Sequence, residues 1–265
     1  MILEVLISTM DRKDISFLNH MFINNNLSDL NILIINQTDS KTLLKSDAVN
    51  IRVINSFEYG LSKSRNLAIE HTIGDICLIA DDDAVYEKDF YNTILNAFKK
   101  NPSSTLITFK AKNLKGTSYR EYDNQNTKHT QQTIKDIMSL EVAFNSEKIK
   151  AFDIKFDTRF GLGSEFPTAE EYLFSRDIIN KGLIGKFYNE FIVSHPQFNS
   201  GMALGNDDIV YARAALNYKI LSFFVYLWIP KYMFFLMRHS YIKPKELISK
   251  VLISFQGIKA YRESD

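Results

Sequence analysis

Short apolar runs alternate with segments of helical spacing along the first 113 residues of the chain. The runs are rich in β-branched residues and are expected to form strands at 2–8, 31–37, 51–55, 75–80 and 105–113. The spacing of apolar residues predicts helices at 16–25, 62–73 and 87–100. Strands that alternate with helices in this way usually pair in parallel, with helices on both faces of the sheet. The pattern therefore predicts an α/β fold with a mostly parallel central sheet flanked by helices.

Polar residues mark the ends of these elements and interrupt the later part of the chain. Ser62 is expected to cap the second helix, and Pro102 stops the third. The polar segment 115–133 is predicted to be a long excursion from the sheet. A strand at 141–145 and a helix from Thr168 are expected after it.

The last sixty residues differ in character from the rest. Residues 218–239 are dense in aromatic and aliphatic side chains, but the unbroken apolar part, 220–229, is shorter than the ~20 residues that a membrane-spanning helix needs. Residues 206–265 carry nine Lys and Arg against five Asp and Glu, a local excess of four positive charges. Apolar faces flanked by bases favour helices that lie on an anionic membrane surface. The alternative is a helical lid packed on the preceding domain. In either case the change in composition predicts a domain at 1–205 and a helical extension after it.

Composition and missing motifs exclude several classes of protein. The chain is 45% apolar and 24% charged, which is ordinary for a globular protein, and its net charge of +1 provides no basic field for nucleic acid. No G-x-G-x-x-G follows the first strand and no Walker A motif is present, which argues against dinucleotide oxidoreductases and P-loop ATPases. A single cysteine, Cys77, and the lack of a signal-peptide pattern fit a cytoplasmic protein.

Polar side chains follow each of the first four predicted strands. They are Ser8 to Arg12, Asn36 to Asp39, Glu58 to Gly60, and the triplet Asp81, Asp82 and Asp83. In an open parallel sheet, ligands bind beyond the carboxyl ends of the strands. We therefore expect these four groups to face one cleft.

The aspartate triplet is the strongest chemical signal in the chain. Three adjacent carboxylates repel one another, and a divalent cation relieves that repulsion while it bridges to phosphate oxygens. Side chains alternate along an extended strand, so Asp81 and Asp83 are expected on one side and Asp82 on the other. The structural alternative is a solvated cap at the end of a strand.

Three segments resemble the family 2 glycosyltransferases, which have the GT-A fold. Residues 55–90 are similar to the family core, with a Gly-Leu-x-x-x-Arg-Asn helix start, an apolar strand and a D-x-D signature. Residues 5–14 resemble the first strand and nucleotide loop, and 164–196 resemble the acceptor segment with its acidic pair. The resemblance covers roughly residues 1–200. It implies a nucleotide-binding half at about 1–113 and an acceptor half at about 134–200.

The resemblance implies inverting transfer of a sugar from a nucleotide-diphosphate sugar, with Mn²⁺ or Mg²⁺. The family commonly uses UDP-linked donors, so a uridine nucleotide is expected. It makes Glu171 the general base and leaves Glu170 to orient it or to touch the acceptor. It implies metal ligation by Asp83, Asp81 and His195. The expected donor contacts are Asp11 and Asp39 for the base and ribose, Arg65 for the nucleotide or its diphosphate, and Thr9, Gly60, Asp81 and Asp82 around them. The acceptor is expected to be a saccharide or a lipid-linked saccharide of a cell-surface glycan, at the inner face of the cell membrane.

The chain departs from the family pattern in three places. Glu171 stands where the family usually has Asp, and the loop before the acid pair reads FPTA where the family often has Gly-Gly. The Gln-x-x-Arg-Trp motif of processive synthases is absent, since the one tryptophan is Trp228 in the tail. We therefore expect one sugar to be added per encounter.

The candidate residues also have structural interpretations. Acids in the first turn of a helix favour its dipole, which alone could explain Glu170 and Glu171. His195 could be a polar residue at a strand end, and Arg65 could be a surface partner of Glu58 or Glu70.

Two other functions compete with sugar transfer. Asp81-x-Asp83-x-Val85 also fits the signature of haloacid-dehalogenase-like phosphatases, in which Asp81 would be the nucleophile. That signature belongs on a first strand, whereas here three strands precede it. The second competitor is a non-catalytic scaffold that binds a nucleotide sugar.

Overall fold

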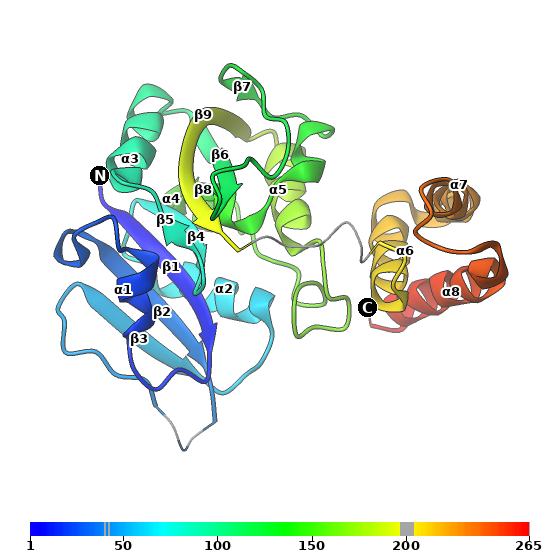
Figure 1. The fold of residues 1–265 in the computed structure, drawn as a ribbon, viewed down its shortest axis with the longest axis horizontal. Helices are drawn as coiled ribbons and strands as arrows, with labels where there is room; N and C mark the ends of the chain where they lie inside the picture. The colour runs from blue at the N-terminus through cyan, green and yellow to red at the C-terminus, as the bar shows by residue number, and fades with distance from the viewer. Residues whose placement is uncertain (40, 42, 197–203, 265) are drawn as a thin grey trace. The chain divides into compact units, whose positions relative to one another are not determined.

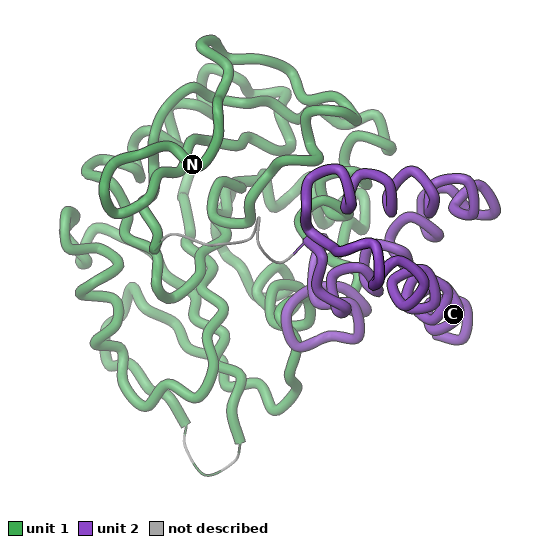
Figure 2. Tube along the Cα trace, turned by 45° about the vertical axis from the view of Figure 1, so that its right-hand side comes forward, with its two compact units in different colours: residues 1–157, 170–197 green, residues 158–169, 198–265 purple. Residues whose placement is uncertain are grey.

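A computed structural model describes residues 1–39, 41, 43–196 and 204–264 of the chain. The chain forms two compact units, which Figure 2 colours separately. The sheet unit contains residues 1–157 and 170–197, and the helical unit contains 158–169 and 198–265. Residues 158–169 therefore pack with the C-terminal helices, although the sequence predicts a boundary only after residue 205.

The sheet unit is built on one mixed sheet with helices on both faces (Figure 1). Its elements are β1 (Leu3–Met10), α1 (Phe17–Met21), β2 (Asn31–Gln37), β3 (Ile51–Ser56), α2 (Leu61–His71), β4 (Ile76–Asp81), β5 (Val85–Tyr86), α3 (Phe90–Lys100), β6 (Ser104–Asn113), β7 (Thr127–Lys128), β8 (Val142–Asn145), α4 (Ser146–Ala151), α5 (Glu170–Asn180) and β9 (Ile184–His195), with short 3₁₀ turns η1 (Leu27–Asp29), η2 (Thr133–Asp136) and η3 (Ser139–Glu141). Among the described residues the strand order is β3-β2-β1-β4-β8-β6-β9-β5, and β7 pairs with β9.

The parallel part of the sheet is the part that the sequence pattern predicts. Strands β3, β2, β1 and β4 pair in parallel, as do β6 and β9. Strand β8 enters between β4 and β6 and is antiparallel to both, and β5 and β7 pair antiparallel with β9. The expected α/β sheet is therefore present, but its second half is mixed.

The expected N-cap at Ser62 is wrong. Helix α2 begins at Leu61, and its N-cap is Gly60, whose φ of 126° suits glycine and few other residues. Ser62 is buried inside the first turn.

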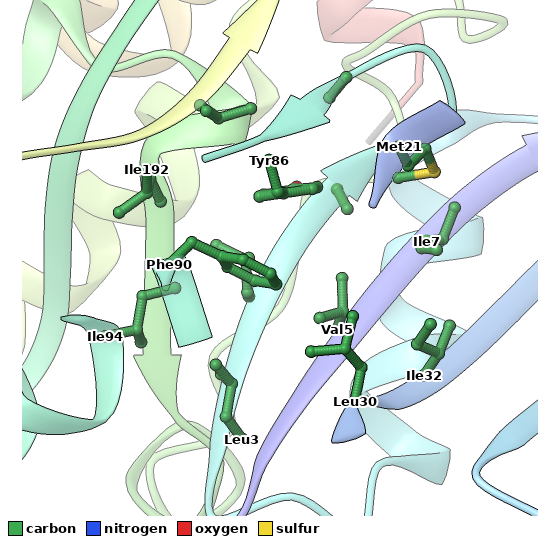
Figure 3. Close-up of a cluster of buried hydrophobic side chains, with 14 of the residues drawn as sticks. Leu3, Val5, Ile7, Met21, Leu30, Ile32, Tyr86, Phe90, Ile94 and Ile192 are labelled. Carbon is green, nitrogen blue, oxygen red and sulfur yellow. The ribbon is translucent and has the colours of Figure 1, made fainter. Parts of the chain in front are cut away.

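Continuous apolar strands bury both faces of the sheet, because successive side chains point to opposite faces. On β1, Val5 and Ile7 join the cluster that α1 and α3 cover, and Leu6 joins the opposite cluster with α2, α4 and α5. Figure 3 shows the first cluster, where Tyr86 and Phe90 pack beside the β1 side chains. The rigid core holds the strand ends in fixed positions.

The helical unit contains α6 (Asp207–Leu221), η5 (Ser222–Phe224), α7 (Val225–Arg238), η6 (Pro244–Glu246) and α8 (Leu247–Glu263). Its core includes Val210, Ile229, Leu236 and Ile258. Ser222 has a φ of 50° and separates α6 from α7.

By length and composition alone, the helical stretch Asp207–Arg238 could cross a membrane. It has 32 residues, and its most apolar 18-residue window has a mean hydropathy of 1.7 with 28% of the window buried. The unbroken apolar run at 220–229 is much shorter than this stretch, because Lys219, Pro230 and Lys231 interrupt the apolar residues within the helices.

Candidate functional site

Polar residues gather where the parallel strands end, as the sequence predicts. Thr9 is buried at the end of β1. The Gly60 N–H donates a 2.7 Å hydrogen bond to the Gln37 side chain at the end of β2. The Ser64 hydroxyl of α2 donates a 2.9 Å hydrogen bond to Ser8 of β1. These hydrogen bonds connect the start of α2 to the carboxyl ends of β1 and β2. We call this side of the sheet, where the parallel strands end, the carboxyl edge.

Asp82 forms an ion pair with Arg12 at the carboxyl edge of the sheet. One of its carboxylate oxygens accepts hydrogen bonds from the Thr9 hydroxyl and from the Arg12 guanidinium, at 2.8 Å from Nε. A second guanidinium nitrogen of Arg12 lies 2.7 Å from the same oxygen. Arg12 therefore holds Asp82 against the end of β1.

Arg65 links Asp81 to the acid pair of α5. Its guanidinium is 3% exposed and lies 3.2 Å from Asp81 Oδ1 and 3.0 Å from Glu170 Oε1. Ser139 donates a 3.2 Å hydrogen bond to the other Asp81 oxygen. Burial by itself would lower the pKa of Arg65, but the charges of Asp81 and Glu170 outweigh it. The buried cation therefore pairs with two carboxylates of the protein, whereas the sequence assigns Arg65 to the nucleotide.

The two glutamates at the start of α5 differ in their surroundings. Glu170 is 6% exposed and pairs with Arg65. Burial first, and then the charge of Glu170, raises the pKa of Glu171 to about 8. A hydrogen bond with Glu170 acts in the same direction. The Glu171 carboxyl is therefore a weaker acid than an ordinary glutamate side chain.

The residue before the acid pair has a backbone conformation that favours glycine. Ala169 has a φ of 74°, a region that few non-glycine residues adopt. A glycine at position 169 would adopt this conformation with less strain than the alanine does.

Asp83 pairs with His195 at the end of β9. His195 Nε2 lies 2.7 Å from Asp83 Oδ1, and His195 Nδ1 lies 2.7 Å from the Pro196 carbonyl oxygen. A carbonyl only accepts hydrogen bonds, so Nδ1 carries a proton. The hydrogen bond with His195 is the main cause that lowers the pKa of Asp83. Burial acts to lower the pKa of His195, but the bond with Asp83 outweighs it and raises the pKa.

The Asp83 and His195 pair has the donors that a cation would need. The Asp83 side chain is 54% exposed and that of His195 is 2% exposed, so the carboxylate faces solvent while the ring is fixed. A carboxylate oxygen suits Mg²⁺ or Mn²⁺, and an imidazole nitrogen suits transition metals, so the pair fits Mn²⁺ better than Mg²⁺. In the part of the chain that the structure describes, no group of three or more His, Cys, Asp or Glu could hold a metal ion. Further ligands would have to come from water and from a phosphorylated ligand.

Two predicted residues lie at the same edge with exposed side chains. Asp11 follows β1 with a φ of 53°, and its N–H donates to the Gln37 carbonyl at 2.9 Å. Asp39 follows β2 and accepts a 2.8 Å hydrogen bond from the Lys41 N–H.

Sequence reasoning missed the roles of three residues. Arg12 belongs to the polar group Ser8 to Arg12 that follows the first strand. A positive charge predicted to lie near three aspartates could have indicated its ion pair with Asp82. Ser139 contacts Asp81 from η3, and Tyr119 contacts the His195 backbone from the polar excursion. Neither lies in a periodic pattern, so nothing in the local sequence indicated these long-range contacts.

A family model described as "Glycosyl transferase family 2" matches residues 15–160, more than half of the chain. The comparison with curated proteins found no match.

Solved structures with a similar fold include TarS of S. aureus. The crystal structure of TarS 1–349 has a TM-score of 0.58 and 14% identity, and the alignment covers 84% of this chain and 66% of that chain. The same fragment in complex with UDP-GlcNAc has a TM-score of 0.57 and 16% identity, with 84% and 67% covered. The alignment covers 39% of the longer TarS chain at a TM-score of 0.56, 14% identity and 82% of this chain. At these identities the likeness shows the fold alone.

Proposed function

Because the chain belongs to glycosyl transferase family 2, we propose that it transfers a sugar from a UDP-linked donor to a saccharide or lipid-linked saccharide, with inversion. The family and the GT-A-like fold class that the sequence predicts are confirmed by the family match and by the likeness to TarS. One observation carries the proposal. Arg65 joins Asp81 of the triplet to Glu170 of the acid pair, which supports a donor site and an acceptor site next to each other.

Glu171 is the proposed general base. Its carboxylate takes the proton of the acceptor hydroxyl, whose oxygen forms a bond to the anomeric carbon as the bond to the diphosphate breaks. Attack from the face opposite the leaving group inverts the configuration at that carbon. Glu170 is held by Arg65 and orients the start of α5, so we assign it a positioning role.

Asp83 and His195 are the proposed cation ligands, with Asp81 bonded to Arg65 and Ser139 beside them. A bound Mn²⁺ would supply positive charge for the departing diphosphate. The ion pair of Arg12 with Asp82 orders the start of the loop after β1. We propose that the nucleotide contacts Thr9 at the end of β1, Asp11 in that loop, Asp39 after β2 and Gly60 before α2.

Nucleotide binding tests this assignment. Calorimetry with UDP, GDP, dTDP and CDP is expected to show one preferred nucleotide, UDP, whose affinity rises at least about tenfold with Mn²⁺. Asp83→Ala should lose that gain, because it removes the exposed cation ligand. Asp47→Ala, which changes an exposed aspartate before β3, should bind as wild type does. Equal binding by Asp83→Ala, or no metal-dependent binding by wild type, would contradict the cation site.

The phosphatase alternative has less support. The family match is with glycosyltransferases, and the triplet follows β4 rather than a first strand. Asp81, the nucleophile of that alternative, is bonded to Arg65 and Ser139. The scaffold alternative predicts binding without turnover, which a donor hydrolysis or transfer assay decides. Addition of one sugar per encounter stays a prediction.

We also propose that the helical unit binds an anionic membrane surface, at the inner face of the cell membrane. Exposed apolar side chains follow one face of η5 and α7, namely Phe223, Phe224, Leu227 and Phe234, at 61–73% exposure. Lys231 and Arg238 share that face, and α7 contains no acid. Ile248 and Leu252 of α8 are 75% and 57% exposed, and a Tyr226–Phe255 ring contact of 6.0 Å joins the two helices.

Vesicle sedimentation tests the membrane proposal. The double change Leu227→Ser and Phe234→Ser is expected to weaken binding to anionic phosphatidylglycerol vesicles by at least about tenfold, because two apolar side chains no longer enter the lipid. Ile73→Ser removes an exposed apolar side chain of the sheet unit and should leave binding unchanged. Binding by wild type that is equal on neutral and anionic vesicles would refute the role of the bases. Self-association without vesicle binding would show that a second copy covers this face.

A further inference from the structure

Besides Asp83, the segment that follows β6 also contacts His195. After β6 it makes a tight turn, in which the Asn113 N–H donates to the Thr117 carbonyl at 2.8 Å. Asn113 is paired in register with His195 of β9. The next residues, 119–122, form a short segment that we call the strap. The strap therefore begins beside His195, although it lies more than seventy positions away in sequence.

The Tyr119 hydroxyl fixes the backbone around His195. It lies 2.7 Å from the His195 carbonyl oxygen and 2.8 Å from the Pro196 carbonyl oxygen. The Pro196 carbonyl also accepts the hydrogen bond from His195 Nδ1. That carbonyl is therefore held between the Tyr119 hydroxyl and the His195 ring.

The rest of the strap is anchored on a buried acid. Glu141 has 0% exposure, and its two carboxylate oxygens accept hydrogen bonds from Arg120 at 2.6 Å and from the Tyr122 hydroxyl at 2.5 Å. The Tyr122 hydroxyl also lies 3.0 Å from the Ala111 nitrogen and 3.2 Å from its carbonyl oxygen. A buried carboxylate that loses such partners costs stability, so these contacts fix the position of the strap.

We propose that Tyr119 is a positioning residue for His195, an inference that rests on the proposed cation site. Tyr119 orients the Pro196 carbonyl, which fixes the Nδ1 proton of His195. The ring is then held with Nε2 toward Asp83, so that Nε2 and the Asp83 carboxylate are placed together as the two proposed cation ligands. Residues that hold the outer nitrogen of a ligating histidine typically change metal affinity about 10–100-fold when they are removed.

The experiment compares two hydroxyl deletions in the same strap. In Tyr119→Phe we expect the Mn²⁺ affinity of the UDP complex to fall about tenfold, with metal-free UDP binding within about twofold of wild type. KM for Mn²⁺ should rise while kcat at saturating Mn²⁺ changes less. Tyr122→Phe removes a hydroxyl that bonds Glu141 and Ala111 instead, while Arg120 still anchors the strap on Glu141. It should therefore lower thermal stability and leave Mn²⁺ affinity unchanged.

A measurement without metal separates this inference from the proposed function. In ¹⁵N-histidine spectra, with His195 assigned through His195→Ala, wild type should show a protected Nδ1–H of His195 that Tyr119→Phe loses and Tyr122→Phe keeps. If wild type binds Mn²⁺ and UDP but Tyr119→Phe keeps both the signal and the affinity, the inference is overturned and the proposed function stands. If wild type binds no Mn²⁺, the cation site fails, and the spectra alone decide whether Tyr119 holds the ring. A loss of stability in Tyr119→Phe with the signal and affinity intact would make its role structural and overturn the inference.

Discussion

Glu171→Gln is expected to lower kcat about 10²–10⁴-fold, because it removes the group that accepts the proton of the acceptor hydroxyl. Glutamine keeps the size of the side chain and resembles the protonated acid, so the fold should be retained. Binding of UDP with Mn²⁺ should stay within about twofold, since Glu171 is not among the proposed donor contacts. Steady-state transfer assays and calorimetry on the same preparation check both outcomes.

The matched control is Glu147→Gln, which changes an exposed acid in the first turn of α4. It should retain wild-type activity. If Glu171→Gln keeps more than about a tenth of the wild-type kcat, another group takes the proton, and Glu170 becomes the candidate.

The raised pKa of Glu171 has consequences for activity and for stability. The base works only when ionised, so the acidic limb of kcat/KM should lie near pH 8 rather than in the ordinary glutamate range. A carboxyl whose pKa is raised by folding contributes stability below its unfolded pKa and loses it as the pH rises through the folded value. Wild type should therefore lose more stability between pH 5 and pH 9 than Glu171→Gln. An acidic limb near pH 4.5 would contradict the assignment.

The fold was largely predictable because both faces of its first strands are buried. Residues 32–35 and 76–80 are apolar at consecutive positions, which distinguishes a covered parallel strand from an exposed one. The antiparallel direction of β8 was not predictable, since a strand of four residues carries no information about its direction. The cap of α2 was missed because a glycine with positive φ replaced the expected serine cap.

The location of the site was predictable, but its pairings were not. The triplet lies at the end of β4, as expected from the strand pattern. The expected alternation of side chains fails after Asp81, because the strand ends there and Asp82 and Asp83 lie in a turn. The partners Arg65–Glu170 and Asp83–His195 are 105 and 112 residues apart in sequence. Such contacts depend on the three-dimensional order of strands, which local periodicity does not contain.

Arg65→Met is expected to lower the free energy of unfolding by about 3–5 kcal/mol, because it leaves Asp81 and the buried Glu170 without their common cation. Arg65→Lys should recover only part of this loss, since an ammonium cannot bridge both carboxylates as the planar guanidinium does. Arg52→Met is the control. Its partner Glu4 is also buried but keeps hydrogen bonds from Thr72 and from a backbone N–H, so the loss should be about 1–2 kcal/mol. Urea denaturation measures all three variants, and a loss below about 1 kcal/mol for Arg65→Met would show that the two carboxylates do not depend on Arg65.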